Sequence, residues 1–137
     1  MANEHTLVIE THRPISIVVA NGLGFEKGTL LKLSGSFLAA SQTANNDVCG
    51  GVAQREKIAA NGQTQTAVYR GGVFKGTISG TVTLGSPLIA DSTANMLRAP
   101  TTMSGANVWG LALESGTTGQ TILWELRPWR NLGNMTN

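Results

Sequence analysis

Apolar residues along this chain recur at every second position more often than at every third or fourth. That period is typical of strands with one buried face, whereas an amphipathic helix spaces its apolar residues by three or four. The apolar segments are short, and most of them are bounded by glycine, asparagine or serine, which favour turns. We therefore expect an all-β fold, a small β-barrel or sandwich-like domain with long loops.

The alternation predicts two short extended segments near the N-terminus, at 7–9 and 15–19, interrupted by Pro14. Proline cannot donate a hydrogen bond to a neighbouring strand, so the first segment is either an extended arm or an edge strand. Further strands are expected at 29–33, 52–58, 64–74, 77–84, 108–113 and 120–127.

Two stretches, 34–50 and 90–107, are rich in serine, threonine, asparagine and alanine and are expected to be long loops. Residues 36–40 and 95–98 could each form one helical turn, which is too short to be stable alone. We expect three parts: an extended N-terminal arm with the first strands over 1–20, a β-barrel-like domain over 21–130 and a mobile C-terminal tail over 131–137.

Glycines recur at matching positions in the two halves of the chain. Gly28 and Gly85 lie 57 residues apart, Gly51 and Gly110 lie 59 apart, and Gly62 and Gly119 lie 57 apart. The last pair belongs in both halves to a Gly-Gln-Thr sequence, which suits a hairpin loop because glycine readily adopts positive φ. The pattern indicates either an internal duplication or a coincidence of the kind that glycine-rich β proteins produce.

The composition narrows the possible partners. Charged residues make up 13% of the chain, against about 25% in ordinary soluble proteins, so much of the surface is neutral. The net charge of +2 comes from ten basic and eight acidic residues that form no cluster, which argues against a nucleic-acid partner. The N-terminus lacks a secretory signal and no apolar run approaches the roughly 20 residues that span a bilayer, so we expect a soluble intracellular product and no membrane partner.

The sequence offers no convincing catalytic, metal or cofactor site. Cys49 is the single cysteine, which excludes an internal disulfide, and it is expected to be a small buried or loop residue. His5 and His12 would lie on opposite faces of an extended segment, which disfavours a shared metal ion. The Asn-Gly-Leu-Gly stretch at 21–24 lacks the spacing and the following helix of a dinucleotide site. We expect no enzyme activity and no cofactor.

The three tryptophans suggest contacts with other molecules. Trp109 and Trp124 lie in expected strands, as core or subunit-contact residues. Trp129 follows a proline and has Arg127 and Arg130 nearby, a composition favoured at protein interfaces, although the ring could also fold back over the end of the barrel.

Five segments resemble, in order and spacing, the capsid decoration (cement, or head-stabilising) proteins of tailed bacteriophages. They are 51–53, 61–64, 68–76, 82–88 and 108–114, and the resemblance covers about residues 20–128. It implies a β-barrel-like decoration domain on the outer surface of the mature capsid of a virion assembled in the host cytoplasm. It also implies trimers at the three-fold and quasi-three-fold positions, which stabilise the shell against the pressure of the packaged DNA. The implied partners are the major capsid protein and other copies of this chain.

Candidate contact residues follow from this interpretation. The N-terminal segment could add as a strand to a sheet edge of the capsid protein or of a neighbouring copy. The candidate capsid-binding arm comprises Thr6, Leu7, Val8, Ile9, Glu10 and Arg13, and the candidate subunit contacts are Trp109, Trp129, Arg127 and Arg130.

Two other functions remain open at this point. A tail or fibre module of the virion could share the fold and occur in few copies. A carbohydrate-binding module could use Tyr69, Trp109, Trp124 and Trp129 as stacking surfaces, although no cluster of aromatic and acidic residues marks one set of loops.

Overall fold

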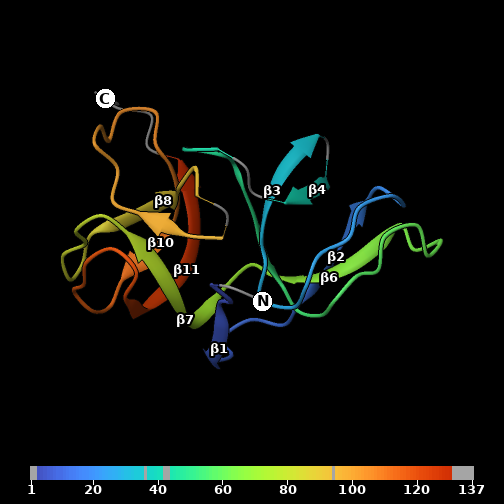
Figure 1. Cartoon of the computed structure of the whole chain (residues 1–137), viewed down its shortest axis with the longest axis horizontal. Coiled ribbons are helices and arrows are strands. Elements are labelled where there is room, and N and C mark those ends of the chain that lie inside the picture. The colour runs from blue at the N-terminus through green and yellow to red at the C-terminus, as the bar shows by residue number, and fades with distance from the viewer. Residues whose placement is uncertain (1–2, 36, 42–43, 94, 131–137) are drawn as a thin grey trace.

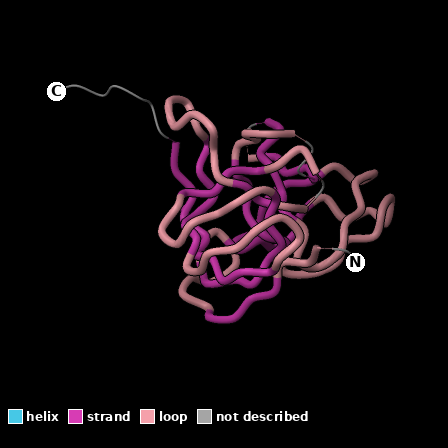
Figure 2. Tube along the Cα trace, turned by 60° about the vertical axis from the view of Figure 1, so that its left-hand side comes forward, coloured by secondary structure: helices cyan, strands magenta, loops and turns pink. Residues whose placement is uncertain are grey.

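The computed structural model describes residues 3–35, 37–41, 44–93 and 95–130. All regular elements among these residues are strands, which confirms the predicted all-β fold (Figure 1, Figure 2). The strands are β1 (Thr6–Ile9), β2 (Ile15–Val19), β3 (Leu30–Gly35), β4 (Leu38–Ser41), β5 (Cys49–Ala53), β6 (Gln65–Tyr69), β7 (Gly72–Ser79), β8 (Pro87–Ala90), β9 (Leu97–Arg98), β10 (Asn107–Ala112) and β11 (Thr121–Arg130).

The strands form two barrels that lie side by side (Figure 1). The first barrel closes in the order β2-β4-β3-β5-β6. The second runs β7-β11-β10-β8-β9 and is closed by a parallel pairing of β7 with β9. Strand β1 lies outside both rings and pairs antiparallel with β7.

The two barrels have the same topology, so of the two interpretations of the glycine spacing, duplication or coincidence, the fold supports duplication. Each of β2 to β6 has its counterpart in β7 to β11, with the same partners and the same strand directions. Gly28 and Gly85 stand before β3 and β8 with φ of 81° and 84°, and Gly62 and Gly119 stand before β6 and β11 with φ of 86° and 85°. These four sites need glycine because other residues rarely adopt such angles.

The two stretches expected to be long loops contain the strands that close the barrels. Strand β4 pairs in parallel with β2, through Val18 and Leu38, and β9 pairs in parallel with β7, through Ile78 and Leu97. The helical turns considered at 36–40 and 95–98 are wrong for the described residues: 38–40 and 97–98 are strand, and Phe37 and Asn95 are turn residues with φ of 53° and 61°. Both strands also pair antiparallel with the strand that precedes them, β4 with β3 and β9 with β8, but they are too short to show an alternating pattern in the sequence.

Several strand boundaries also differ from expectation. The expected strand at 64–74 is two strands, β6 and β7, which belong to different barrels, and β5 ends at Ala53 rather than continuing to residue 58. Strand β8 was not predicted. Pro128 lies inside β11. The pairing of β11 with β7 ends at Leu126, so the missing N–H of Pro128 removes no hydrogen bond to β7.

The principal core fills the second barrel and extends into the first. Trp109, Trp124 and Phe74 are at most 1% exposed there, and Leu30, Cys49, Val52 and Tyr69 of the first barrel belong to the same apolar cluster. Tyr69 contacts Phe74 with ring centroids 5.7 Å apart, and Phe74 contacts Trp124 at 5.6 Å. A smaller cluster around Ile17, Leu31 and Val68 fills the first barrel. The shared cluster joins the barrels through apolar contacts.

Of the two alternatives for the N-terminal segment, an extended arm or an edge strand, the structure shows the edge strand. Residues 6–9 are an edge strand on the second barrel, His5 is buried, and 15–19 form a strand of the first barrel. Strand β1 precedes the strands of the first barrel in the sequence, but it pairs with β7 of the second barrel. It does so because β9 covers only residues 78–79 of β7 and leaves residues 73–75 free to pair. The expected tail at 131–137 lies outside the described residues.

Candidate interaction surfaces

The buried reactive groups of the chain serve the fold. Burial lowers the pKa of His5 to about 4, although a hydrogen bond to the Asn95 carbonyl acts in the opposite direction. The neutral ring accepts a hydrogen bond from Trp124 Nε1 at Nδ1 (3.1 Å) and lies 2.9 Å from the Asn95 carbonyl through Nε2. A Cβ on Gly76 would overlap this ring, so the site is shaped around the imidazole.

Cys49 and Lys57 are similarly enclosed. Burial raises the pKa of the Cys49 thiol to about 12, which leaves it a poor nucleophile. Lys57 is 2% exposed, and its Nζ donates to the carbonyls of Leu23 (2.7 Å) and Asn21 (3.0 Å). These bonds tie two loops of the first barrel together.

The described part of the chain offers neither a metal-ligand cluster nor a membrane-spanning helix. Its residues include no group of three or more histidine, cysteine or acidic side chains placed to hold a metal ion. Within residues 3–35, 37–41, 44–93 and 95–130, no helix has the length and apolarity needed to cross a membrane.

The outer face of the second barrel carries an apolar row that continues onto β1. Cross-strand pairing places one residue from each of five neighbouring strands in line: Ile9, Val73, Glu125, Leu111 and Pro87. Ile9 is 55% exposed and the others are half-buried. Four of the five side chains are thus apolar on a barrel face that is turned towards solvent.

The outer edge of β1 is a free strand edge. Both rings are closed, whereas β1 has a strand partner on one side only among the described residues. Val8 and Ile9 on this strand are about half exposed. A short edge with exposed apolar side chains can accept an added strand from a partner.

A groove lies at the junction of the two barrels, with a volume of about 210 Å³. Its rim carries Trp129 and Val48, which are 46% and 47% exposed. Arg70 also borders it, and its Nη1 donates to the carbonyls of Cys49 (2.8 Å) and Gly50 (3.2 Å). The remaining lining residues are Leu33, Cys49, Asn107, Val108 and Pro128. The groove combines apolar walls with one guanidinium group.

The candidate subunit contacts are placed differently from one another. Trp109 is fully buried and donates from Nε1 to the Asp47 carbonyl (2.9 Å), so it is a core residue and cannot be a surface contact. Trp129 is exposed at the groove rim. Arg127 is exposed and its Nε lies 3.8 Å from Glu125 Oε2, while the backbone of Arg130 pairs with Asn107.

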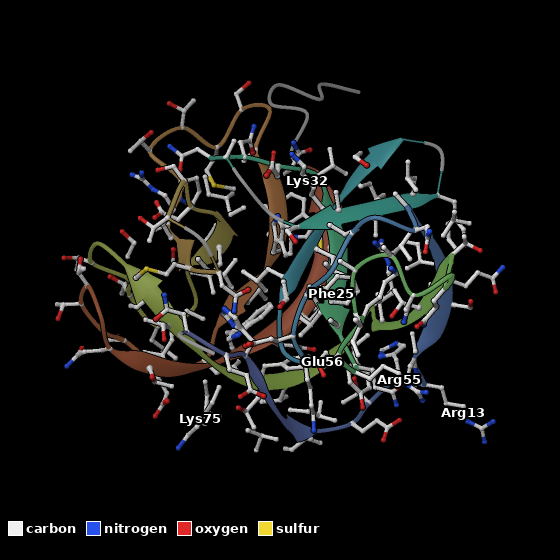
Figure 3. All side chains as sticks on the ribbon, turned by 45° about the vertical axis from the view of Figure 1, so that its right-hand side comes forward. Arg13, Phe25, Lys32, Arg55, Glu56 and Lys75 are labelled. Atoms are coloured by element: carbon white, nitrogen blue, oxygen red, sulfur yellow. The ribbon has the colours of Figure 1, made fainter. Side chains whose placement is uncertain are left out.

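The candidate arm residues run from β1, on the second barrel, to the start of the first barrel, where Arg13 lies near Arg55 (Figure 3). Thr6, Leu7, Val8 and Ile9 form β1, and Glu10 and Arg13 are exposed in the connection to β2. Leu7 turns towards the principal core, whereas Val8 and Ile9 face solvent.

The structure weakens the carbohydrate-binding alternative. Trp109 and Trp124 are fully buried and Tyr69 is 9% exposed, so three of the four aromatic rings considered for stacking are unavailable to a sugar.

The groove residues Arg70 and Val48 were not predicted from the sequence. The groove is assembled from segments of both barrels, so no local pattern marks it.

Comparisons with known proteins show a shared fold. No protein-family model matches the chain, and no curated protein matches it. Among solved structures, the crystal structure of the head fiber gp8.5 N base of bacteriophage phi29 is similar, with a TM-score of 0.54 and 16% sequence identity. The match covers 82% of this chain and 92% of that chain, so the likeness extends over nearly the whole described fold.

Proposed function

We propose that this chain is a structural protein of a tailed-phage head that binds the exterior of the capsid. The observation that carries the proposal is the fold shared with the base of a phage head fiber over 82% of this chain. The resemblance of five sequence segments to capsid decoration proteins supports the same location. The proposed role is mechanical and involves no catalysis.

The finer proposal is that the protein decorates the shell as trimers at its three-fold and quasi-three-fold positions. A protein that binds the expanded lattice better than the precursor or disrupted shell stabilises that lattice by the difference in binding free energy. Several weak contacts are sufficient, because attachment of one subunit of a trimer raises the effective concentration of the others.

The surface of the molecule suits contact with a neutral lattice. The apolar row from Ile9 to Pro87 and the free edge of β1 offer side-chain and backbone contacts on one side of the second barrel. Charged residues are few, which limits the cost of desolvating charges in an interface. We therefore assign the capsid contact to β1 and the sheet face beside it, with the candidate residues Thr6, Leu7, Val8, Ile9, Glu10 and Arg13.

A head-fiber base that occurs in fewer copies is the second candidate, and the similarity to the phi29 head fiber base favours it specifically. Both candidates predict binding to the head, and they differ in the number of copies per virion.

Reconstitution tests the proposal. Purified protein is added to mature, DNA-filled heads that lack it, and the heads are sedimented and then heated. We expect saturable co-sedimentation and a higher temperature of DNA release, because the bound protein stabilises the intact lattice. Absence of binding, or binding to an unrelated phage shell to the same extent, would contradict the proposal.

A further inference from the structure

Arg70 places a positive charge in the junction groove without a negative partner. Its hydrogen bonds use Nη1 and end on the backbone carbonyls of Cys49 and Gly50. The ion pairs of Arg98 with Asp91 and of Arg127 with Glu125 do not involve Arg70, which pairs with no carboxylate among the described residues. A partly buried guanidinium therefore retains N–H donors suited to an acceptor that enters the groove.

The walls around this charge are apolar. Trp129 and Val48 are exposed at the rim, and Leu33, Val108 and Pro128 complete the lining. Tryptophan and arginine are enriched in the centres of protein interfaces, where a pocket filled by an apolar side chain supplies much of the binding energy. The volume of about 210 Å³ is small and fits one large side chain better than an extended ligand.

We infer that this groove docks a segment of the capsid shell protein that presents a carboxylate beside a large apolar side chain. The carboxylate pairs with Arg70, and the apolar side chain packs between Trp129 and Val48. This inference rests on the proposed function and adds a second contact, separate from β1. The apolar lining favours a protein segment over a sugar, which would need several polar partners.

Three variants of the groove test the inference in the reconstitution assay. Trp129→Ala removes the exposed ring, Arg70→Gln removes the charge, and Val48→Asp places a carboxylate at the rim where it opposes the incoming one. We expect each to weaken binding to heads by about tenfold or more. Arg55→Gln is the matched control, because it removes the same charge at an exposed position outside the groove. Figure 3 shows Arg55 far from Lys32, which is next to the groove residue Leu33 in the sequence.

Salt dependence separates a binding role of Arg70 from a structural one. Pairing with a carboxylate predicts that wild-type affinity falls as salt rises and that the slope is shallower in Arg70→Gln. Thermal unfolding of each variant verifies that the fold is retained. If Arg70→Gln does not fold, Trp129→Ala and Val48→Asp decide the matter, since both positions are exposed at the rim.

The possible outcomes are distinct. If wild-type protein binds heads and the groove variants bind equally well, the inference is overturned and the proposed function stands. If wild-type protein does not bind heads, the proposed function fails, and the inference fails with it. If wild-type protein self-associates and Trp129→Ala abolishes this, the groove holds a second copy. If a free acidic sugar competes with head binding, the groove holds a glycan. A groove that holds a second copy or a glycan overturns the inference.

Discussion

His5 connects the N-terminal strand to both barrels through a buried network. Its ring contacts Trp124 in the core of the second barrel, and Asn95 bonds both to His5 and to the start of β3, where its Oδ1 accepts a hydrogen bond from Leu30 N (2.6 Å). Asn95 also donates from Nδ2 to the Gly28 carbonyl (3.1 Å). The two polar side chains hold β1, β3 and β11 in one arrangement.

This network predicts that acid destabilises the protein. The pKa of His5 is about 4 in the folded state against 6.5 for the free group, so the unfolded chain binds more protons between these values. Stability is therefore highest above pH 6.5 and falls as the pH drops towards 4, by about 3 kcal/mol at 1.36 kcal/mol per pKa unit.

Urea unfolding at pH 7 and pH 4.5 measures this effect. His5→Gln should be less stable at pH 7 and should lose less stability on acidification, whereas His12→Gln, at an exposed position, should behave like the wild type. An equal loss on acidification in His5→Gln and the wild type would show that other groups cause the acid sensitivity.

At the residue scale, sequence reasoning succeeded where one residue type has one common environment. Cys49 is buried, as expected for a small cysteine without a base nearby, and Trp124 belongs to the core. The burial of His5 was not predicted, because it depends on Gly76 and Trp124, which lie far along the chain. The groove at Arg70 was missed for the same reason.

At the scale of elements, the loop before β5 fastens the first barrel to the second. Asn46 donates from its backbone N to the Ala90 carbonyl (3.2 Å) and from Nδ2 to the Gly105 carbonyl (3.2 Å). Its Oδ1 accepts a hydrogen bond from Asn107 N (2.6 Å). The residue has φ of 63°, which asparagine tolerates better than most residues.

Replacement of Asn46 therefore tests the attachment of the barrels. We expect Asn46→Ala to reduce the free energy of unfolding by about 2–3 kcal/mol, because it removes two side-chain hydrogen bonds and because alanine tolerates left-handed backbone less well than asparagine does. Asn46→Gly loses the same hydrogen bonds but adopts left-handed backbone without strain. Its free energy of unfolding should therefore be about 1 kcal/mol higher than that of Asn46→Ala. Chemical denaturation of the three proteins measures the difference, and equal stability of Asn46→Ala and the wild type would refute the role of this loop.

Strands with regular alternation were the predictable elements. Strands β2 and β11 lie close to their expected positions, and in both of them buried and more exposed residues alternate along part of the strand, which leaves a period of two. Strands β3 and β10 also lie close to expectation, although their buried residues are consecutive. Strands β4 and β9 have only four and two residues, and each is held between a preceding antiparallel strand and a more distant parallel one, so their sequences carry no alternating pattern.

At the scale of the whole molecule, the glycine spacing in the sequence indicated a duplication, and the fold contains one. Gly28, Gly62, Gly85 and Gly119 all have positive φ, so the matching glycines occupy equivalent turns in the two barrels. The sequence did not indicate that the repeats form separate closed rings, because closure depends on β4 and β9. Nor did it indicate that the N-terminal strand crosses to the second ring.

The role proposed for this chain is that of a tailed-phage head protein that decorates the shell. Quantitative mass spectrometry of purified virions, with the copy number of this chain expressed relative to the major capsid protein, tests it most directly. Lattice-wide decoration predicts a ratio near one. A ratio of a few per hundred would contradict lattice-wide decoration and indicate a sparse head fiber, a vertex or the tail, and complete absence from the virion would contradict the claim itself.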